Sequence, residues 1–169
     1  RPTVRAMSGH ETDLSRPPLM QHQREALGTI GRFLESDKHF SMSVKGMIST
    51  GKTRLLADVA IEIARSGRQA IPLTPNRRLA WAASQRDGIE CNSIYQHLYD
   101  IGGAEEQSGK VDGATKTIPL RPCEDSDDCV YLVDDAHLLG NALFQTPDGK
   151  QFGTGYLLAD LFAFTGLGT

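Results

Sequence analysis

The segment GMISTGKT, residues 46–53, constrains the fold of this chain more than any other part of the sequence. Gly46, Gly51, Lys52 and Thr53 fill every required position of the pattern G-x-x-x-x-G-K-[ST], which connects a strand to a helix and surrounds a phosphate with backbone N–H groups. The flanking residues suit that position. Residues 40–46 alternate apolar and polar side chains, and residues 53–67 carry apolar side chains at helical spacing. We therefore expect a strand, a phosphate-binding loop and a helix, in that order.

Each residue type in the loop has a chemical role. Gly51 allows backbone N–H groups to close around a phosphate, Lys52 reaches the terminal phosphates, and the Thr53 hydroxyl ligates Mg²⁺. The first turn of the helix adds a partial positive charge beneath the phosphates. The residues predicted to bind the nucleotide phosphates are Gly46, Met47, Ile48, Ser49, Thr50, Gly51, Lys52, Thr53 and Arg54.

The remaining segments alternate between helical and strand patterns. We expect helices over residues 20–34 and 77–88, a strand over 68–76 that Pro72 interrupts, and a buried parallel strand over 129–135. This alternation predicts an α/β domain with three layers and a mostly parallel sheet. Residues 1–18 have the composition of a linker or arm, and residues 101–116 that of a mobile surface loop within the domain spanning 19–169. Trp81, Tyr95 and Tyr99 are expected in the core.

The sequence VYLVDDAH, residues 130–137, supplies a second nucleotide-related pattern. A strand that ends in acids places carboxylates at the carboxyl edge of the sheet, where open α/β folds bind ligands. We expect Asp134 to hold Mg²⁺ opposite Thr53, and Asp135 to position or deprotonate the attacking water. The alternative for Asp135 is a solvated or capping acid before the next turn.

Composition excludes several classes of protein. The 169 residues include 39% hydrophobic and 23% charged residues, enough for one globular domain. A net charge of −3 excludes a broad basic field, so contacts with nucleic acid must be local. The three cysteines lack a metal-ligand spacing, and the chain has no apolar run of membrane-spanning length. We expect an intracellular, cytoplasmic protein that has no membrane partner and is part of a longer chain.

Five segments resemble the first five motifs of superfamily 1 helicases, in the order of that family. They are PLMQHQREAL at 18–27, GMISTGKT at 46–53, LTPNRRLA at 73–80, NSIYQHLY at 92–99 and VDDAHLLGN at 133–141. The branch most similar to this chain is the RecD type, because the apolar segment FGTGYLLADLFAF at 152–164 follows the acidic motif. The resemblance covers most of the chain from residue 18 onward.

The resemblance implies the first RecA-like motor domain of an enzyme that couples ATP and Mg²⁺ to movement on single-stranded DNA or RNA. It implies that Gln23 contacts the adenine, which its amide can do because it is both donor and acceptor, although Gln21 lies nearby. It also implies a face that grips a single strand, formed by Thr74, Pro75, Asn76, Arg77, Ser93, Tyr95 and His97. Arg77 and Arg78 have the alternative role of a solvated helix face.

This chain departs from the family pattern at three points. Ser49 replaces the usual second glycine of the loop, and Asp135 replaces the usual glutamate. The chain also stops before the third motif, and the resemblance implies that a second RecA-like domain of the parent chain supplies the transition-state arginine. The isolated segment should therefore bind ATP better than it hydrolyses it. Two alternatives stay open, a regulatory or signalling P-loop ATPase without nucleic acid and a degenerate nucleotide-binding module.

Overall fold

The computed structural model describes residues 18–36, 38–47, 50–87, 90–102, 116–140, 142–146 and 149–166, and these residues form an α/β fold. The predicted arm at 1–18 lies almost wholly outside the described residues, as does most of the predicted mobile loop at 101–116. The predicted α/β class is confirmed, because helices alternate with strands that pair in parallel.

The larger sheet has the strand order β2-β1-β4, with β1 (Ala70–Thr74) in the centre. Both neighbours, β2 (Asn92–Ser93) and β4 (Val130–Val133), run parallel to it. The parallel strand predicted before Asp134 is therefore confirmed, although its four residues are half-buried rather than buried. Because all three strands are parallel, their carboxyl ends meet at one edge of the sheet.

Pro72 does not interrupt its strand, contrary to the sequence prediction. The Gln69 carbonyl accepts a hydrogen bond from the Val130 N–H, and the Leu73 carbonyl accepts one from the Asp134 N–H. Successive residues of a strand direct their backbone groups to opposite sides, so the nitrogen of Pro72, next to Leu73, points away from β4. On that other side, pairing with β2 begins only at Leu73. The nitrogen of Pro72 therefore faces a position that needs no ladder hydrogen bond, and the strand continues through it.

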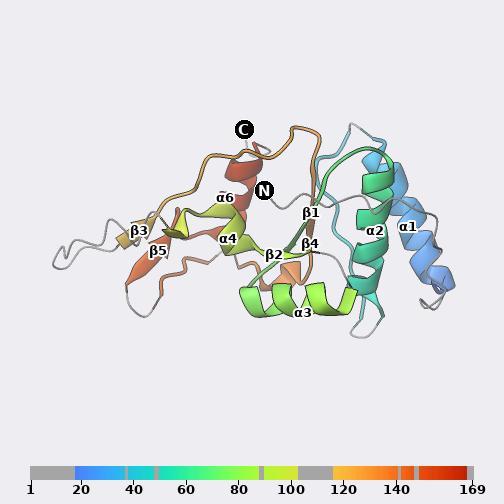
Figure 1. Cartoon of the computed structure of the whole chain (residues 1–169), viewed down its shortest axis with the longest axis horizontal. Helices are drawn as coiled ribbons and strands as arrows, with labels where there is room; N and C mark the ends of the chain where they lie inside the picture. The colour runs from blue at the N-terminus through green and yellow to red at the C-terminus, as the bar shows by residue number, and fades with distance from the viewer. Residues whose placement is uncertain are drawn as a thin grey trace.

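One face of this sheet is covered by α1 (Gln21–Leu34) and α2 (Lys52–Arg65), whose boundaries agree with the two predicted helices. Residues on that face of the strands, Ala70, Val130 and Leu132, pack with the apolar side chains of both helices. Figure 1 shows α2 beside the sheet and α1 outside it. The lower end of α2 in this view, where the helix begins, lies at the edge where the strands end.

The other face of the sheet packs against α4 (Ile94–Leu98) and α6 (Leu157–Thr165). This second core includes Ile71, Leu73 and Val133, which alternate along the strands with the residues of the first core. A separate two-stranded parallel sheet, β3 (Lys116–Ile118) with β5 (Lys150–Phe152), extends this side of the molecule. The short 3₁₀ helix η1 (Ala136–Leu138) follows β4.

A buried carboxylate connects these elements. Asp160 in α6 is 0% exposed, and it accepts hydrogen bonds from the Tyr99 hydroxyl at 2.7 Å and the Thr154 hydroxyl at 2.7 Å. The Thr154 backbone N–H donates to the same carboxylate at 3.1 Å. Gly153 approaches so closely that a Cβ built there would lie 2.3 Å from an Asp160 oxygen. The network joins the end of α4 to the turn before α6.

The strand predicted over residues 40–46 does not form. This segment has no secondary structure assigned, and every residue in it is exposed, including Phe40 at 65%, Met42 at 40% and Val44 at 43%. A strand requires a neighbour that accepts its backbone hydrogen bonds, and no described strand pairs with this segment. The alternation of residue types is present, but it has no partner in the described structure.

Trp81 is also exposed, although the sequence analysis placed it in the core. It lies on α3 (Arg77–Asp87), which crosses the carboxyl edge of the sheet, and its exposed fraction is 68%. Ala80 takes the buried position of that helix, at 5% exposure. None of the helices in the described ranges has both the length and the apolar character needed to cross a bilayer.

Candidate nucleotide site

The loop that matches the phosphate-binding pattern, residues 46–53, ends in the first turn of α2. Gly51 caps this helix in the left-handed conformation, with φ of 78°, and Lys52 is the first helical residue. Glycine is required here for two reasons, the positive φ and the lack of space for a Cβ, which would lie 2.3 Å from Nε2 of Gln23. The free N–H groups of the first turn are thus presented at the loop, as anion binding requires.

Lys52 folds back over its own loop. Its Nζ donates to the Gly46 carbonyl at 2.9 Å and to the Met47 carbonyl at 2.8 Å. Thr50 donates its hydroxyl to the same Met47 carbonyl at 2.8 Å. The ammonium group is therefore held inside the loop by neutral acceptors, which a phosphate can replace with charge-assisted hydrogen bonds. Ile48 and Ser49 lie outside the described residues, so the predicted contribution of Ser49 stays a prediction.

Gln23 contacts the loop directly. Its side chain is 4% exposed, its Oε1 accepts from the Met20 N–H at 2.9 Å, and its Nε2 donates to the Thr50 carbonyl at 3.2 Å. The resemblance implied an adenine contact for this residue. An amide has two donor hydrogens and a carbonyl with two lone pairs, so these two bonds leave capacity for a further partner. The contact with adenine stays a prediction, whereas the contact with the loop is observed.

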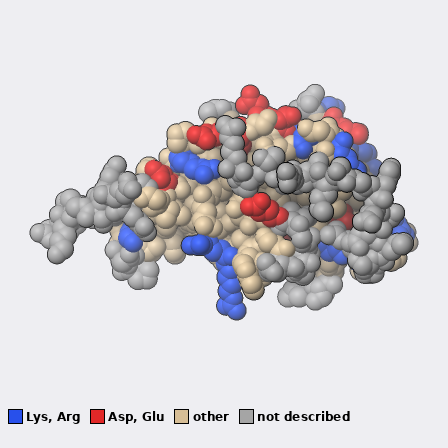
Figure 2. Space-filling view, viewed as in Figure 1, with Lys and Arg blue, Asp and Glu red and all other residues tan. Residues whose placement is uncertain are grey.

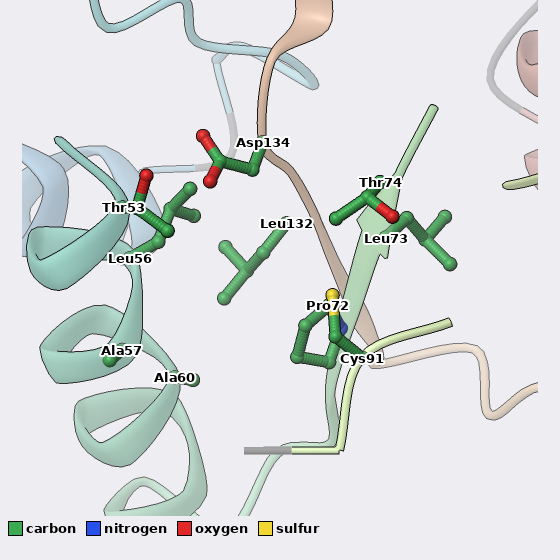
Figure 3. Close-up of a pocket in the computed structure, with 10 residues that line it drawn as sticks. All are labelled: Thr53, Leu56, Ala57, Ala60, Pro72, Leu73, Thr74, Cys91, Leu132 and Asp134. Atoms are coloured by element: carbon green, nitrogen blue, oxygen red, sulfur yellow. The ribbon is translucent and has the colours of Figure 1, made fainter. Parts of the chain in front are cut away.

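Thr53 and Asp134 line one cavity between α2 and the sheet. The other lining residues are Leu56, Ala57, Ala60, Pro72, Leu73, Thr74, Cys91 and Leu132. Figure 3 shows the Asp134 carboxylate directed towards the Thr53 hydroxyl across the mouth of this mostly apolar cavity. A hydroxyl and a carboxylate are oxygen ligands of the kind that Mg²⁺ prefers, with water completing its coordination. These two residues therefore fit the metal that the sequence predicts.

The described residues contain no group of three or more His, Cys, Asp or Glu side chains that could hold a metal ion. This finding concerns only larger groups of ligands, such as those of zinc sites. It does not bear on a pair formed by one threonine and one aspartate, because Mg²⁺ bound with phosphates uses only one or two protein ligands.

Asp135 adopts an unusual backbone conformation. Its φ is 50°, and it is the only residue other than glycine with positive φ among those described. Its N–H donates to the Asp134 carboxylate at 2.9 Å, and its own carboxylate lies 4.0 Å from Nδ1 of the exposed His137. Left-handed backbone outside glycine is uncommon and clusters at functional positions. The turn separates the two acids, so that Asp134 faces the cavity and Asp135 is partly exposed.

The residues predicted to grip a nucleic acid divide into two groups. Thr74 at 2% exposure and Ser93 at 1% are buried where β1 and β2 end, and Pro75 is buried beside them. Asn76 and Arg77 are exposed at the start of α3, where the Asn76 side chain accepts from the Leu79 N–H at 3.0 Å and caps the helix. Of these five residues, only Asn76 and Arg77 can meet a ligand without a change in the described structure.

His97 belongs to a buried hydrogen-bonded cluster. Its Nε2 lies 2.8 Å from an Asp125 oxygen that also accepts from the Tyr131 hydroxyl at 2.7 Å. Because an ionised carboxylate only accepts, Nε2 is the donor in this contact. Burial lowers the pKa of His97 below its usual value of 6.5, while the hydrogen bond and charge of Asp125 oppose that change. Its ring packs edge-on against Phe164, with centroids 5.5 Å apart.

Tyr95 and Tyr99 pack with each other and with Phe152, as their spacing predicted. The two tyrosine rings stack at 5.9 Å between centroids, and Phe152 lies 5.0 Å from Tyr95 and 5.2 Å from Tyr99. Burial raises the pKa of both hydroxyls, and in Tyr99 the bond to Asp160 adds to the effect. Tyr95 is only half-buried, so its predicted contact with a base stays a prediction.

Sequence reasoning did not single out Asp160 or Asp125. A signal for Asp160 was its position within an otherwise apolar helix, LLADLFAFT, where a lone acid must find partners. Asp125 lies in the acidic segment EDSDD and has no comparable signal.

No family model, curated protein or solved structure matches the chain.

Proposed function

We propose that this chain is the ATP-binding part of a nucleic-acid-dependent ATPase of the RecA-like helicase or translocase type. The observation that carries the proposal is the arrangement at the carboxyl edge of the sheet. Gly51 caps α2 in the left-handed conformation, Lys52 folds into the loop, and Thr53 faces Asp134 across one cavity. These parts came from segments about 80 residues apart, and nucleoside triphosphate binding accounts for all of them.

Each residue has a defined role in this proposal. The N–H groups at the start of α2 and the Lys52 ammonium group bind the phosphates, and both act as preorganised positive charge. Thr53 and Asp134 hold Mg²⁺, which neutralises charge on the phosphate oxygens when bound. Asp135, two residues beyond the end of β4 and partly exposed, orients the attacking water. Gln23 supports the loop through Thr50 and has amide capacity left for the adenine.

The nucleic-acid part of the proposal is supported by position and residue type. Asn76 and Arg77 are exposed directly after β1, at the same edge as the nucleotide residues. Contacts from amide and guanidinium groups suit phosphate oxygens rather than base edges, so binding should tolerate any sequence. Because the net charge is −3, only a few local cationic contacts can bind the phosphates of the strand. The affinity for nucleic acid should therefore fall with salt, but with a shallow slope.

The first experiment measures nucleotide binding by calorimetry with a slowly hydrolysed ATP analogue and Mg²⁺. Wild type should bind, Lys52→Ala should lose tight binding while its far-UV circular dichroism stays unchanged, and Asp134→Asn should weaken only the Mg²⁺-dependent part. Asp135→Asn should bind like wild type and lose turnover in the parent protein. A wild type that fails to bind, or a Lys52→Ala variant that binds equally well, would refute the phosphate site.

The second experiment measures steady-state ATPase activity of the parent protein with and without single-stranded DNA and RNA. Stimulation by a single strand supports the motor proposal. Activity that no strand changes would identify a regulatory ATPase instead, and binding without turnover would identify a nucleotide-binding module.

A further inference from the structure

The outer face of α3 carries a solvent-exposed indole. Trp81 has 68% of its surface exposed, which is more than any described Phe or Tyr residue, and it is the only tryptophan of the chain. The opposite side of the helix packs inward, because Ala80 is 5% exposed and the Ser84 hydroxyl donates to the Ala80 carbonyl at 3.0 Å and accepts from the Cys91 N–H at 3.0 Å. Burial of so large an apolar side chain lowers the free energy, so a ligand that covers the indole would gain binding energy.

Two cations share this face. Arg77 precedes Trp81 by four residues and Arg78 precedes it by three, the separations at which side chains on a helix are neighbours, with Cβ atoms about 5–6 Å apart. Both arginines are exposed, and neither forms an ion pair with another residue in the described ranges. Figure 2 shows Lys and Arg side chains projecting from the lower edge of the molecule, beside the place where Figure 1 draws α3.

We propose that the exposed face of α3, formed by Arg77, Arg78 and Trp81, is a stacking platform for single-stranded nucleic acid. One base stacks on the indole of Trp81, and the guanidinium groups contact the phosphates on either side of that nucleotide. The inference rests on the proposed function and adds to it a residue that contacts the bases. A single strand is favoured over an acidic peptide because its bases offer a flat π-face to the indole, which carboxylates lack.

The position of the platform connects it to the nucleotide site. Only Pro75 and Asn76 separate the end of β1 from α3, and Thr74 holds that turn by donating its hydroxyl to the Asn76 carbonyl at 3.0 Å. At the end of β1, Leu73 accepts a hydrogen bond at 3.0 Å from the N–H of Asp134, the predicted metal ligand. A nucleic-acid strand bound on α3 would therefore be separated from the Asp134 carboxylate only by β1 and one short, hydrogen-bonded turn.

The single tryptophan provides its own reporter. Wild type is titrated with a dT oligonucleotide and a U oligonucleotide, each of about 12 nucleotides, within the site sizes of single-strand binders. Indole emission reports stacking, and anisotropy of the fluorescein-labelled strands reports binding independently. Emission should be quenched with the same midpoint as the anisotropy. Trp81→Ala should weaken binding about 5- to 150-fold, which corresponds to the loss of about 1–3 kcal/mol for one stacked base, and Trp81→Phe should retain most of the affinity.

A matched control is Phe144→Ala, which removes another exposed aromatic, 49% exposed, that follows η1 on a different part of the chain. It should bind strands like wild type. Trp81→Ala should keep its circular dichroism and its affinity for the ATP analogue, because the indole is mostly exposed and belongs to neither hydrophobic core.

The outcomes separate this inference from the function on which it rests. If labelled strands bind while indole emission does not change and Trp81→Ala binds equally well, the platform is wrong and the motor proposal stands. If the strands fail to bind but poly-glutamate quenches the indole, the face serves an acidic protein partner and the platform is again wrong. If no strand binds wild type and none stimulates the ATPase of the parent protein, the proposed function itself fails.

Discussion

Gly51→Ala is the substitution that tests the architecture of the phosphate loop most directly. The native φ of 78° lies in the left-handed region, where an alanine is strained by about 1–2 kcal/mol. The new Cβ would also lie 2.3 Å from Nε2 of Gln23, well inside van der Waals contact, so the amide must move. That movement breaks the 3.2 Å hydrogen bond from Gln23 to the Thr50 carbonyl, which costs about 0.5–1.5 kcal/mol.

The two contributions add to a loss of roughly 1.5–3.5 kcal/mol in the free energy of unfolding. Urea denaturation followed by far-UV circular dichroism measures it, and for a urea dependence of about 1–3 kcal/mol per molar the midpoint should fall by about 1 M. Gly31→Ala is the matched control. Gly31 lies within α1, where a Cβ meets nothing within 4 Å, so that variant should gain about 0.5–1 kcal/mol from helix propensity.

A double-mutant cycle then separates strain from the clash. In a Gln23→Ala background the amide is absent, so Gly51→Ala should cost only the left-handed strain, and the cycle should show a coupling of about 0.5–1.5 kcal/mol. Equal costs of Gly51→Ala in both backgrounds would refute the contact between Gln23 and the loop. A loss below about 0.5 kcal/mol in the wild-type background would refute the left-handed cap.

Two further predictions concern the other core. Tyr99→Phe keeps the ring stacking but removes the hydroxyl that donates to the fully buried Asp160 at 2.7 Å, so it should lower unfolding free energy by about 1.5–3 kcal/mol, whereas Tyr156→Phe, at an exposed tyrosine, should change it by less than about 0.5 kcal/mol. For His97, burial lowers the pKa in the folded protein, so the unfolded chain binds protons more readily. The contribution of neutral His97 to stability should therefore be fully present above pH 6.5 and should decrease as the pH falls below that value. Thermal melts between pH 8 and 5 should show a flatter profile for His97→Gln but not for the control His137→Gln, whose side chain is 74% exposed. A Tyr99→Phe variant as stable as wild type, or an unchanged pH profile in His97→Gln, would contradict the assigned role of that residue.

Local sequence patterns predicted α1, α2 and α3, because helical periodicity and stop residues act within one segment, but they did not predict α4 or α6. The boundaries of α1 and α2 lie within two residues of those expected, and the parallel strand before Asp134 was recognised from its apolar run. Thr53 and Asp134 line one cavity, because β4 delivers Asp134 to the carboxyl edge where α2 begins, whereas their binding of Mg²⁺ stays a prediction.

The errors arose where the outcome depends on partners distant in sequence. Residues 40–46 have the alternation of a strand, but alternation supplies no neighbour for the backbone hydrogen bonds. Trp81 was placed in the core because large aromatics are usually buried, yet the neighbouring Ala80 takes the inward position on α3. The cluster around His97 depends on Asp125, 28 positions away in the chain, and no local spacing reveals such a contact.

Pro72 determines which strand registers are possible. If β2 moved two residues towards the start of β1, one of its carbonyls would face the proline nitrogen, which has no hydrogen to donate. A buried carbonyl without a donor costs about 1–3 kcal/mol, a penalty that the observed register, Leu73 with Asn92, does not incur. The proline thus selects against a misfolded alignment as the chain folds. Because α4 follows β2 directly, the same selection keeps Tyr95, His97 and their neighbours beside the edge where the nucleotide residues meet.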